Sequence, residues 1–332
     1  MTEISIIIVT WNSAVFINKC LRSLYLRSNA SKSEVLVIDN GSQDGTAELV
    51  KEEFANVIII QNKENIGFSR AANLGISKSK GKYIFLLNPD TRFESDVAGT
   101  LAVFLETHME AAAVGPAIYN PDGTVALFSA RELPSLQNMA FRQFGLRKIF
   151  PDHKLIGRET IAGWDRKSVR QVAYLNGSAI MIRREIFNRY GLLDETLPMY
   201  FEDLELSARL SRCKQKLFVV PEAVLTHFGN RSAVQSPSRR ILIAMEDGEA
   251  PWLYFRQYKS GFQAVLFKCL VFSGSVGRLT TYILRNVFTS WAHFQMSENK
   301  ENSLRSQVLL KWALLSSAKF RRLVQWQFPN SC

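Results

Sequence analysis

Short runs of β-branched residues alternate with helically spaced apolar residues over the first ninety positions of the chain. The run Ile4–Val9 is continuously apolar, which is typical of a parallel strand buried on both faces. In Ala14–Arg27, by contrast, apolar residues recur every three or four positions, as on the buried face of an amphipathic helix. Repeated strand–helix–strand units of this kind predict right-handed crossovers and a mostly parallel sheet with helices on its faces.

The same periodicities predict the remaining elements. In the first ninety residues, further strands are expected at 34–38, 57–60 and 83–87, and further helices at 46–54 and 68–78. Beyond residue 110 the expected elements are a hairpin around 120–123, strands at 172–182, 217–220 and 223–227, and helices at 183–190 and 202–213. Residues 131–170 show weak periodicity and many basic and turn residues, so we interpret them as a long, mobile connection.

Composition excludes several classes of protein. The chain is 47% hydrophobic and 21% charged, which rules out a disordered, collagen-like or disulfide-scaffold chain. Its four cysteines form no CxxC pair, so a zinc knuckle is not encoded and a reducing, cytoplasmic location is expected. The N-terminus lacks the pattern of a signal peptide. No membrane span is expected either, because Lys268 interrupts the apolar stretch around 264–276.

The net charge of +11 is concentrated near the C-terminus. Residues 231–332 hold 14 Lys and Arg against 5 Asp and Glu, and the segment Trp252–Phe262 interleaves aromatic residues with Arg256 and Lys259. This composition is typical of helices that bind an anionic membrane surface, and equally of ordinary helical packing with solvated basic side chains. Binding to single-stranded nucleic acid would use the same residue types. We therefore predict a basic, aromatic helical extension over residues 233–332.

Polar residues follow the predicted parallel strands at the edge where such sheets bind ligands. Thr10, Trp11 and Asn12 follow the first strand, Asp39 closes the second, and Asp90 follows the fourth. Asp39 would face a nucleobase or a ribose hydroxyl, or would form a turn and cap the next helix. The carboxylate of Asp90 suits a divalent cation shared with a diphosphate, or again a turn.

Other residues lend themselves to two interpretations. Glu202 and Asp203 begin a predicted helix, where acids also complement the helix dipole, and His227 ends an apolar strand, where histidines are often structural.

The segment 75–82 resembles a P-loop but has five residues between its glycines and precedes a strand. We interpret this segment as a glycine that ends a helix together with solvated lysines. No dinucleotide-binding G-x-G-x-x-G follows the first strand.

Taken in order, these segments resemble inverting family-2 glycosyltransferases with the GT-A fold, and most closely their rhamnosyltransferase-like branch. The matching segments are Ile8–Asn12, Val37–Gly45, Asn65–Phe68, Asn73–Gly75, Leu86–Asp90, Asn176–Ala179, Met199–Leu206 and His227–Gly229. They extend over residues 1–232. The resemblance implies an α/β fold: a GT-A-type nucleotide-diphospho-sugar transferase domain over 1–232, with a mostly parallel central sheet flanked by helices. Its donor half would cover about 1–110 and its acceptor and catalytic half about 111–232, before the helical C-terminal extension.

The resemblance also implies roles in donor binding. Trp11 would stack on the base, Thr10 and Asn12 would shape that pocket, and Asp39 would hydrogen-bond the base or ribose. Asn65 belongs to the same donor-binding set.

For the metal and the base, the resemblance implies a second group of residues. Asp90 matches the last acid of the D-x-D motif and would bind Mg²⁺ or Mn²⁺, with His227 completing the metal shell. Asn88 stands in place of the first acid, which removes one anionic ligand, and we assign it to donor binding. Asp203 matches the catalytic base, with Glu202 beside it.

The implied activity is transfer of a sugar, with L-rhamnose from dTDP-L-rhamnose as the expected donor, to a saccharide or lipid-linked acceptor in cell-surface polysaccharide synthesis such as that of O-antigen. The expected partners are the nucleotide sugar, the acceptor and an anionic membrane surface, with peripheral attachment at the inner face, and nucleic acid is not expected. The alternatives are a UDP-hexose or UDP-N-acetylhexosamine transferase, and a degenerate GT-A module that binds polysaccharide or a partner enzyme. The presence of Asp90, Glu202 and Asp203 argues against degeneracy.

Overall fold

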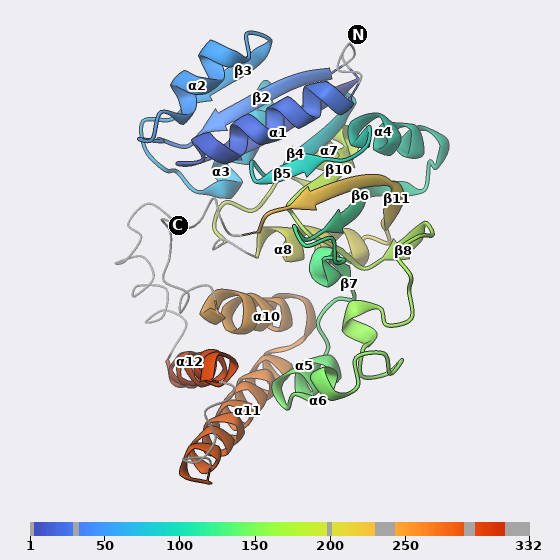
Figure 1. The fold of residues 1–332 in the computed structure, drawn as a ribbon. Helices are drawn as coiled ribbons and strands as arrows, with labels where there is room; N and C mark the ends of the chain where they lie inside the picture. The colour runs from blue at the N-terminus through green and yellow to red at the C-terminus, as the bar shows by residue number, and fades with distance from the viewer. Residues whose placement is uncertain (1–2, 29–32, 198–200, 230–242, 289–295, 316–332) are drawn as a thin grey trace. The chain divides into compact units, whose positions relative to one another are not determined.

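The structure, a computed structural model, describes residues 3–28, 33–197, 201–229, 243–288 and 296–315. These residues form two compact units (Figure 1). The first lies within Met1–Glu132 and Trp164–Ser236, and the second within Leu133–Gly163 and Pro237–Pro329. The division differs from the predicted boundary at residue 232, because residues 133–163 group with the C-terminal helices.

The first unit is built on a mixed sheet with the strand order β3-β2-β1-β4-β10-β6-β11-β5, to which β8 adds through β11 (Figure 1). Its strands are β1 (Ile4–Thr10), β2 (Ser33–Asp39), β3 (Val57–Gln61), β4 (Tyr83–Leu87), β5 (Thr91–Phe93), β6 (Ala111–Tyr119), β8 (Arg170–Val172), β10 (Ala179–Arg183) and β11 (Lys216–His227). Strands β1 to β4 are parallel, as predicted, whereas β10 runs antiparallel to β4 and β6. Strands β6 and β11 also pair in parallel, so the predicted mostly parallel sheet is present, with antiparallel pairing at β10 and at β5 and β8.

Helices cover both faces of this sheet. They are α1 (Ala14–Arg27), α2 (Thr46–Glu53), α3 (Phe68–Lys78), α4 (Val97–Thr107), α7 (Arg184–Tyr190) and α8 (Glu202–Arg212). The α1 residues Ile17 and Leu21 are buried in one core cluster with Ile6 and Ile8 of β1. Successive strand residues point to opposite faces, so Ile7 lies on the other side, under α3.

Gly75 lies inside α3, three residues before its last residue. A Cβ atom at this position would lie 2.5 Å from Cγ2 of Ile7, which is closer than side chains can approach. The glycine is therefore required for the helix to pack tightly against β1, and the helix continues to Lys78.

The strand predicted over 172–182 is interrupted. Residues Arg170–Val172 form β8, Tyr174–Leu175 form β9 and Ala179–Arg183 form β10. Strand β9 pairs with β7 (Ala130–Arg131) in a separate two-stranded sheet. The interruption follows from a local side-chain turn, in which the backbone N–H of Ser178 donates to Oδ1 of Asn176 at 2.9 Å, and apolar periodicity does not reveal such a turn.

Two other expected strands also differ from the prediction. The strands at 217–220 and 223–227 are one strand, β11, whose pairing with β6 is irregular between Val220 and Val224. The hairpin turn at 120–123 is present, but its second arm makes a single bridge and then forms the 3₁₀ helix η2 (Leu127–Ser129).

The second unit is helical. Its elements are α5 (Leu136–Gln143), α6 (Leu146–Ile149), η3 (Arg158–Thr160), the π-helices η4 (Met245–Glu249) and η5 (Phe255–Lys259), α10 (Ala250–Tyr254), α11 (Gly261–Phe288) and α12 (Met296–Leu314). Its core contains Phe255, Phe267 and Trp312, whose ring centroids follow one another at 5.3 and 6.1 Å. Tyr254 and Phe255 are buried, so ordinary helical packing accounts for these two aromatic residues of the C-terminal extension.

Residues 133–163 are a structured part of this unit, which corrects their interpretation as a connection. Arg142 of α5 forms a buried ion pair with Glu159 at 3.3 Å, and it lies 3.8 Å from Asp247 of η4. The backbone carbonyl and side chain of Gln143 accept hydrogen bonds from Arg278 of α11. Charged residues in a segment without periodicity resemble a solvated loop in the sequence, and only these pairings over long sequence separations show that they are buried.

One helix among the described residues is long and apolar enough to cross a membrane. It covers Gly261–Leu284 of α11, with a mean hydropathy of 1.2, although no span was predicted because of Lys268. A core helix of a soluble protein meets the same criterion, but only 28% of its most apolar window is buried here.

Candidate active site

The carboxyl ends of β1, β2 and β4 lie at one edge of the sheet. Thr10 is in register with Asp39, so the loops after β1 and β2 begin at the same level, and Leu87 pairs with Ile8, so the loop after β4 begins two residues earlier along the same edge. The backbone N–H of Asn40 also donates to the carbonyl of Thr10 at 2.8 Å. This edge therefore brings together the residues predicted after the strands.

Asp39 is buried and takes part in a turn. Its carboxylate accepts hydrogen bonds from the hydroxyl of Ser42 and from the backbone N–H of Ser42, the latter at 3.2 Å. Burial raises the pKa of Asp39 above its usual value, and the two hydrogen bonds from Ser42 partly oppose the increase. The turn interpretation of this residue is thus present in the structure, and its role in donor binding stays a prediction.

The turn after β2 also fixes the loop after β1. The hydroxyl of Ser42 accepts from the backbone N–H of Asn12 at 2.8 Å, and Oδ1 of Asn12 accepts from the backbone N–H of Gln43 at 2.8 Å. Asn12 has a φ of +48°, a conformation that asparagine tolerates better than most residues. Trp11, which lies between Thr10 and Asn12, is half-buried. Sequence reasoning placed Ser42 within a matching segment but assigned it no role.

Asn65 has a structural function in a neighbouring loop. Its Oδ1 accepts from Nδ2 of Asn40 at 2.8 Å and from the backbone N–H of Gly67 at 3.0 Å. Asn40 is buried, and its Oδ1 accepts from Nδ2 of Asn62 and the backbone N–H of Ile66. Asn40 therefore joins the loop after β2 to the loop after β3, a contribution that no sequence pattern indicated.

Asp90 and His227 lie together, as the sequence predicted. Nε2 of His227 is 3.2 Å from Oδ1 of Asp90, which is almost fully buried. Their proximity follows from the pairing of Thr91 in β5 with His227 in β11, and from the bond of the Phe228 N–H to the Asp90 carbonyl at 2.9 Å. Among the described residues, no cluster of three or more His, Cys, Asp or Glu side chains is arranged to hold a metal ion.

Asp203 begins α8 and is held by three donors. Its Oδ2 accepts from the hydroxyl of Tyr174 at 2.6 Å and from the backbone N–H of Gly177 at 3.0 Å. Its Oδ1 accepts from the N–H of Leu204 at 2.7 Å. Glu202 is half-buried, and its Oε2 accepts from the N–H of Phe201 at 3.0 Å. Residues 199 and 200, which begin the matching segment, lie outside the described residues.

Tyr174 was not identified from the sequence. It is fully buried, which raises the pKa of its hydroxyl well above the usual value, so this group remains a donor at working pH. The guanidinium of Arg131 lies 4.3 Å from the centre of its ring. Gly177 was only part of a matching segment, yet a Cβ there would lie 3.2 Å from Cβ of Asp203. Strand β9 and the turn after it therefore position the carboxylate.

The turn at residues 176–178 links the two halves of the site. The carbonyl of Ser178 accepts from the backbone N–H of Asn88 at 2.9 Å, while the adjacent Gly177 donates to Asp203. The side chain of Asn88 is half-buried, and its carbonyl accepts from the hydroxyl of Thr91 at 2.8 Å. One short turn thus holds the loop of Asp90 and the carboxylate of Asp203 in a common framework.

Two buried hydroxyls at this edge lack partners among the described residues. They belong to Thr10, at the end of β1, and Ser178, beside Asn88. Buried polar groups are nearly always hydrogen-bonded in folded proteins. A site that a bound polar ligand completes would leave such hydroxyls without a partner in the protein itself.

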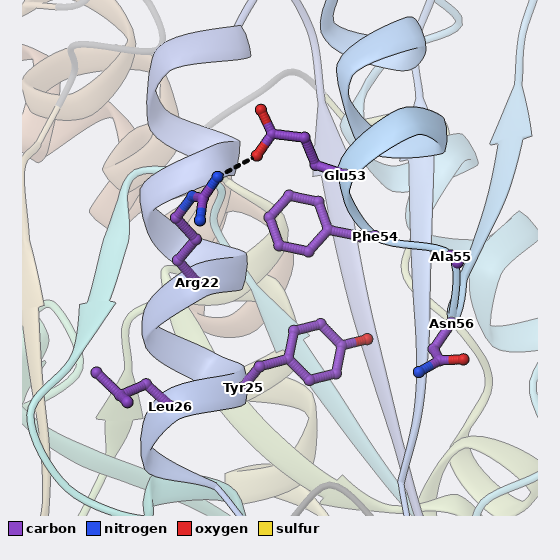
Figure 2. A pocket seen from close by; sticks show the side chains of 7 residues that line it. All are labelled: Arg22, Tyr25, Leu26, Glu53, Phe54, Ala55 and Asn56. Carbon is purple, nitrogen blue, oxygen red and sulfur yellow. Dashed lines mark hydrogen bonds and ion pairs between the residues drawn. The ribbon is translucent and has the colours of Figure 1, made fainter.

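A separate hollow of 580 Å³ lies between α1 and α2 (Figure 2). The rings of Tyr25 and Phe54 stack at 6.1 Å inside it, and Arg22 pairs with Glu53 at its rim. Its residues come from the C-terminal ends of helices that lead into β2 and β3, so it lies toward the opposite edge of the sheet. It contains none of the predicted site residues.

Comparison with known proteins identifies the family. The family described as Glycosyl transferase family 2 matches residues 5–191. The chain is 29% identical over 257 residues to the N-acetylglucosaminyl-diphospho-decaprenol L-rhamnosyltransferase of Mycobacterium tuberculosis, which covers 73% of this chain and 81% of that enzyme. It is 26% identical over 217 residues to the low-salt glycan biosynthesis hexosyltransferase Agl10 of Haloferax volcanii, covering 64% of this chain and 62% of that protein.

Solved structures share the fold. A structure of GalNAc-T7 with UDP, GalNAc and Mn²⁺ superposes with a TM-score of 0.56 at 17% identity, covering 96% of this chain and 57% of that one. The mannosyltransferase PcManGT from Pyrobaculum calidifontis, in complex with GDP-Man and Mn²⁺, gives a TM-score of 0.52 at 15% identity over 94% and 86% of the two chains. The predicted GT-A fold is thereby confirmed. The chain belongs to glycosyl transferase family 2, and it is a glycosyltransferase of the rhamnosyltransferase-like branch.

Proposed function

We propose that this glycosyltransferase moves L-rhamnose from dTDP-L-rhamnose, with inversion, onto a lipid-linked saccharide at the inner face of the cell membrane. The donor and acceptor classes are supported by the mycobacterial relative, whose name specifies an L-rhamnosyl transfer to a diphospho-decaprenol-linked sugar. The observation that carries the proposal is the placement of Asp203, held by Tyr174 and Gly177 on the turn that also holds the loop of Asp90.

Asp203 is the proposed catalytic base. Inverting transfer forms a bond between the acceptor oxygen and the anomeric carbon, and breaks the bond from that carbon to the diphosphate oxygen. The acceptor hydroxyl must lose its proton in the same step, which a positioned carboxylate accepts. A carboxylate offers about four acceptor positions, and the three hydrogen bonds to Asp203 leave one for the acceptor hydroxyl.

Asp90 and His227 fit a divalent cation. Mg²⁺ is usually held by one or two carboxylates together with substrate phosphates, and Mn²⁺ also accepts imidazole nitrogen. Asp90 is buried, and His227 is the described side chain that contacts its carboxylate, so a cation would add charge compensation for this acid. When bound, the cation would neutralise negative charge on the leaving nucleoside diphosphate. With Asn88 in place of the first acid, these two side chains are the proposed protein ligands.

The donor nucleotide is proposed to lie along the ends of β1 and β2. Trp11 would stack on the base between Thr10 and Asn12, and Asp39 would accept hydrogen bonds from the base or ribose. The unpartnered hydroxyl of Thr10 would gain its missing partner there. Asn65 shapes the same edge through Asn40, and its contribution to donor binding would be indirect.

A transfer assay tests the proposal. Purified enzyme would be supplied with Mg²⁺ or Mn²⁺, an N-acetylglucosaminyl-diphospho-prenol acceptor and one of four donors: dTDP-rhamnose, UDP-glucose, UDP-N-acetylglucosamine or GDP-mannose. We expect product from dTDP-rhamnose. Product from a UDP-sugar alone would instead support the UDP-sugar alternative. Donor binding without transfer from any donor would support a degenerate module.

Variants at the start of α8 separate the base from its neighbour. Asp203→Asn should lower transfer by about 10²–10⁴-fold while dTDP binding, measured by calorimetry, is retained. Glu202→Gln, a matched change at the adjacent position, should retain more activity. The opposite order of the two variants would move the role of base to Glu202.

A further inference from the structure

The outward face of α11 is apolar along most of its length. The inward-facing residues Ala264, Phe267 and Val271 are buried in the second unit. On the opposite side, Phe262 is 71% exposed, Val265 59%, and Ile283 and Leu284 about half. Exposed apolar residues between these ends complete the surface that we call the α11 face: Phe262, Val265, Leu266, Phe272, Val276, Ile283 and Leu284.

Both charged residues of this stretch face the protein. Lys268 donates to the carbonyl of Leu315 at 3.0 Å and lies 5.1 Å from the ring centre of Trp312. Arg278 donates to Ser306 at 3.2 Å and to Gln143. Residues 261–284 contain no other charged residue. A surface helix of a soluble protein has the reverse arrangement, with its charges in water and its apolar residues toward the core.

We infer that the α11 face lies in the boundary between headgroups and acyl chains of an anionic bilayer. An apolar helical face of this kind, on a protein segment with excess positive charge, is the composition that such interfacial helices use. The charge is complementary, because residues 231–332 carry 14 basic against 5 acidic residues. The inference deepens the proposed function, since an acceptor attached to a lipid is reached from the membrane surface.

The helix lies along the membrane and does not cross it. Its length would allow a span, because about 20 residues suffice for a typical bilayer. However, its inner side packs against α5 and α12, and α12 carries the charged residues Arg305 and Lys311. A span would bring this charged helix into hydrocarbon, which is costly. Burial of one face only keeps α12 and its charges on the aqueous side.

Vesicle flotation with the full-length chain tests the inference. The vesicles would contain either phosphatidylcholine alone or phosphatidylcholine with phosphatidylglycerol, and neither acceptor nor donor. We expect wild type to float with the anionic vesicles. The double variant Val265→Glu/Phe272→Glu should reduce the bound fraction at least tenfold. The matched control Leu26→Glu/Val103→Glu, at exposed positions of the first unit, should bind like wild type.

Cys269 provides a second readout, because it lies exposed on α11 between Leu266 and Phe272. With Cys213 and Cys332 replaced by Ser, an environment-sensitive fluorophore on Cys269 should shift to the blue when anionic vesicles are added. Lipids that carry a quencher in the acyl chain should quench it.

Three results would overturn the inference. They are equal vesicle binding by the α11 double variant and wild type, an unchanged spectrum of the fluorophore on Cys269, and a dimer in solution whose association the double variant abolishes. The last would show that a second copy of the chain covers the face. None of these readouts depends on catalysis, so transfer to a water-soluble acceptor analogue tests the proposed function separately.

Discussion

The replacement Tyr174→Phe removes one hydroxyl from the site and leaves the aromatic ring beneath Arg131 in place. That hydroxyl donates to Oδ2 of Asp203 at 2.6 Å, within the fully buried environment of Tyr174. The Gly177 N–H would remain as the other donor to this oxygen. The variant therefore tests whether Asp203 must be held by both donors to act as the base.

The expected loss follows from the energy of this bond. A hydrogen bond to a charged group contributes about 1.5–3 kcal/mol. Each 1.36 kcal/mol of lost transition-state stabilisation lowers a rate about tenfold, so kcat should fall by about 10- to 150-fold. The KM for the donor should be unchanged, because Tyr174 contacts none of the residues proposed to bind the nucleotide.

Steady-state kinetics of three variants measure the effect. If Tyr174 acts through Asp203, the double variant Tyr174→Phe/Asp203→Asn should be no slower than Asp203→Asn alone, since groups that act as a unit are not additive. A kcat within twofold of wild type for Tyr174→Phe would refute the reasoning. So would fully additive losses in the double variant, because Tyr174 would then contribute independently of the base.

Three further predictions concern the donor, the metal and the second unit. Since burial raises the pKa of Asp39, its carboxylate should be protonated at a higher pH than is usual for Asp; dTDP affinity measured by calorimetry should therefore begin to fall on acidification at a higher pH than an ordinary aspartate would allow, and Asp39→Asn should lose this part of the pH dependence. Mg²⁺ or Mn²⁺ should tighten dTDP binding in wild type, and Asp90→Ala should remove most of that gain; no metal effect in wild type would also contradict the role of His227. Glu159→Gln should destabilise the second unit of the full-length chain by about 3–5 kcal/mol, because it removes the carboxylate that pairs with both Arg142 and Arg147 and leaves Arg142 only the longer contact to Asp247; a change below 1 kcal/mol in chemical unfolding would show that these pairs are dispensable.

The sequence by itself determined the N-terminal half of the sheet and its helices. The predicted helices at 14–27 and 68–78 and the strand at 83–87 agree with α1, α3 and β4 to the residue. These elements are specified by the period of their own apolar residues, which is a local property. The same order of strands placed Thr10, Asp39 and Asp90 at one edge, because the ends of parallel strands coincide there.

The tertiary structure alone decided how Asp203 is held and what the second unit contains. Tyr174 and Asp203 are 29 positions apart, and their contact depends on the turn at residues 176–178, which breaks a run of apolar residues that reads as one strand. In the sequence, Arg142 and Glu159 resemble residues of a solvated loop, and only the structure shows that they are buried and form an ion pair.

The tertiary structure also decided which side of α11 its charged side chains face. A helical period shows that Lys268 and Arg278 interrupt an apolar segment, but it does not show which side of the helix the rest of the protein covers. That side is set by α5 and α12: Gln143 of α5, Ser306 of α12 and Leu315 directly after α12 satisfy the two charged groups from outside the helix. Local periodicity specifies an element, whereas its partners over long sequence separations determine which of its faces is buried and which is left for a ligand or a membrane.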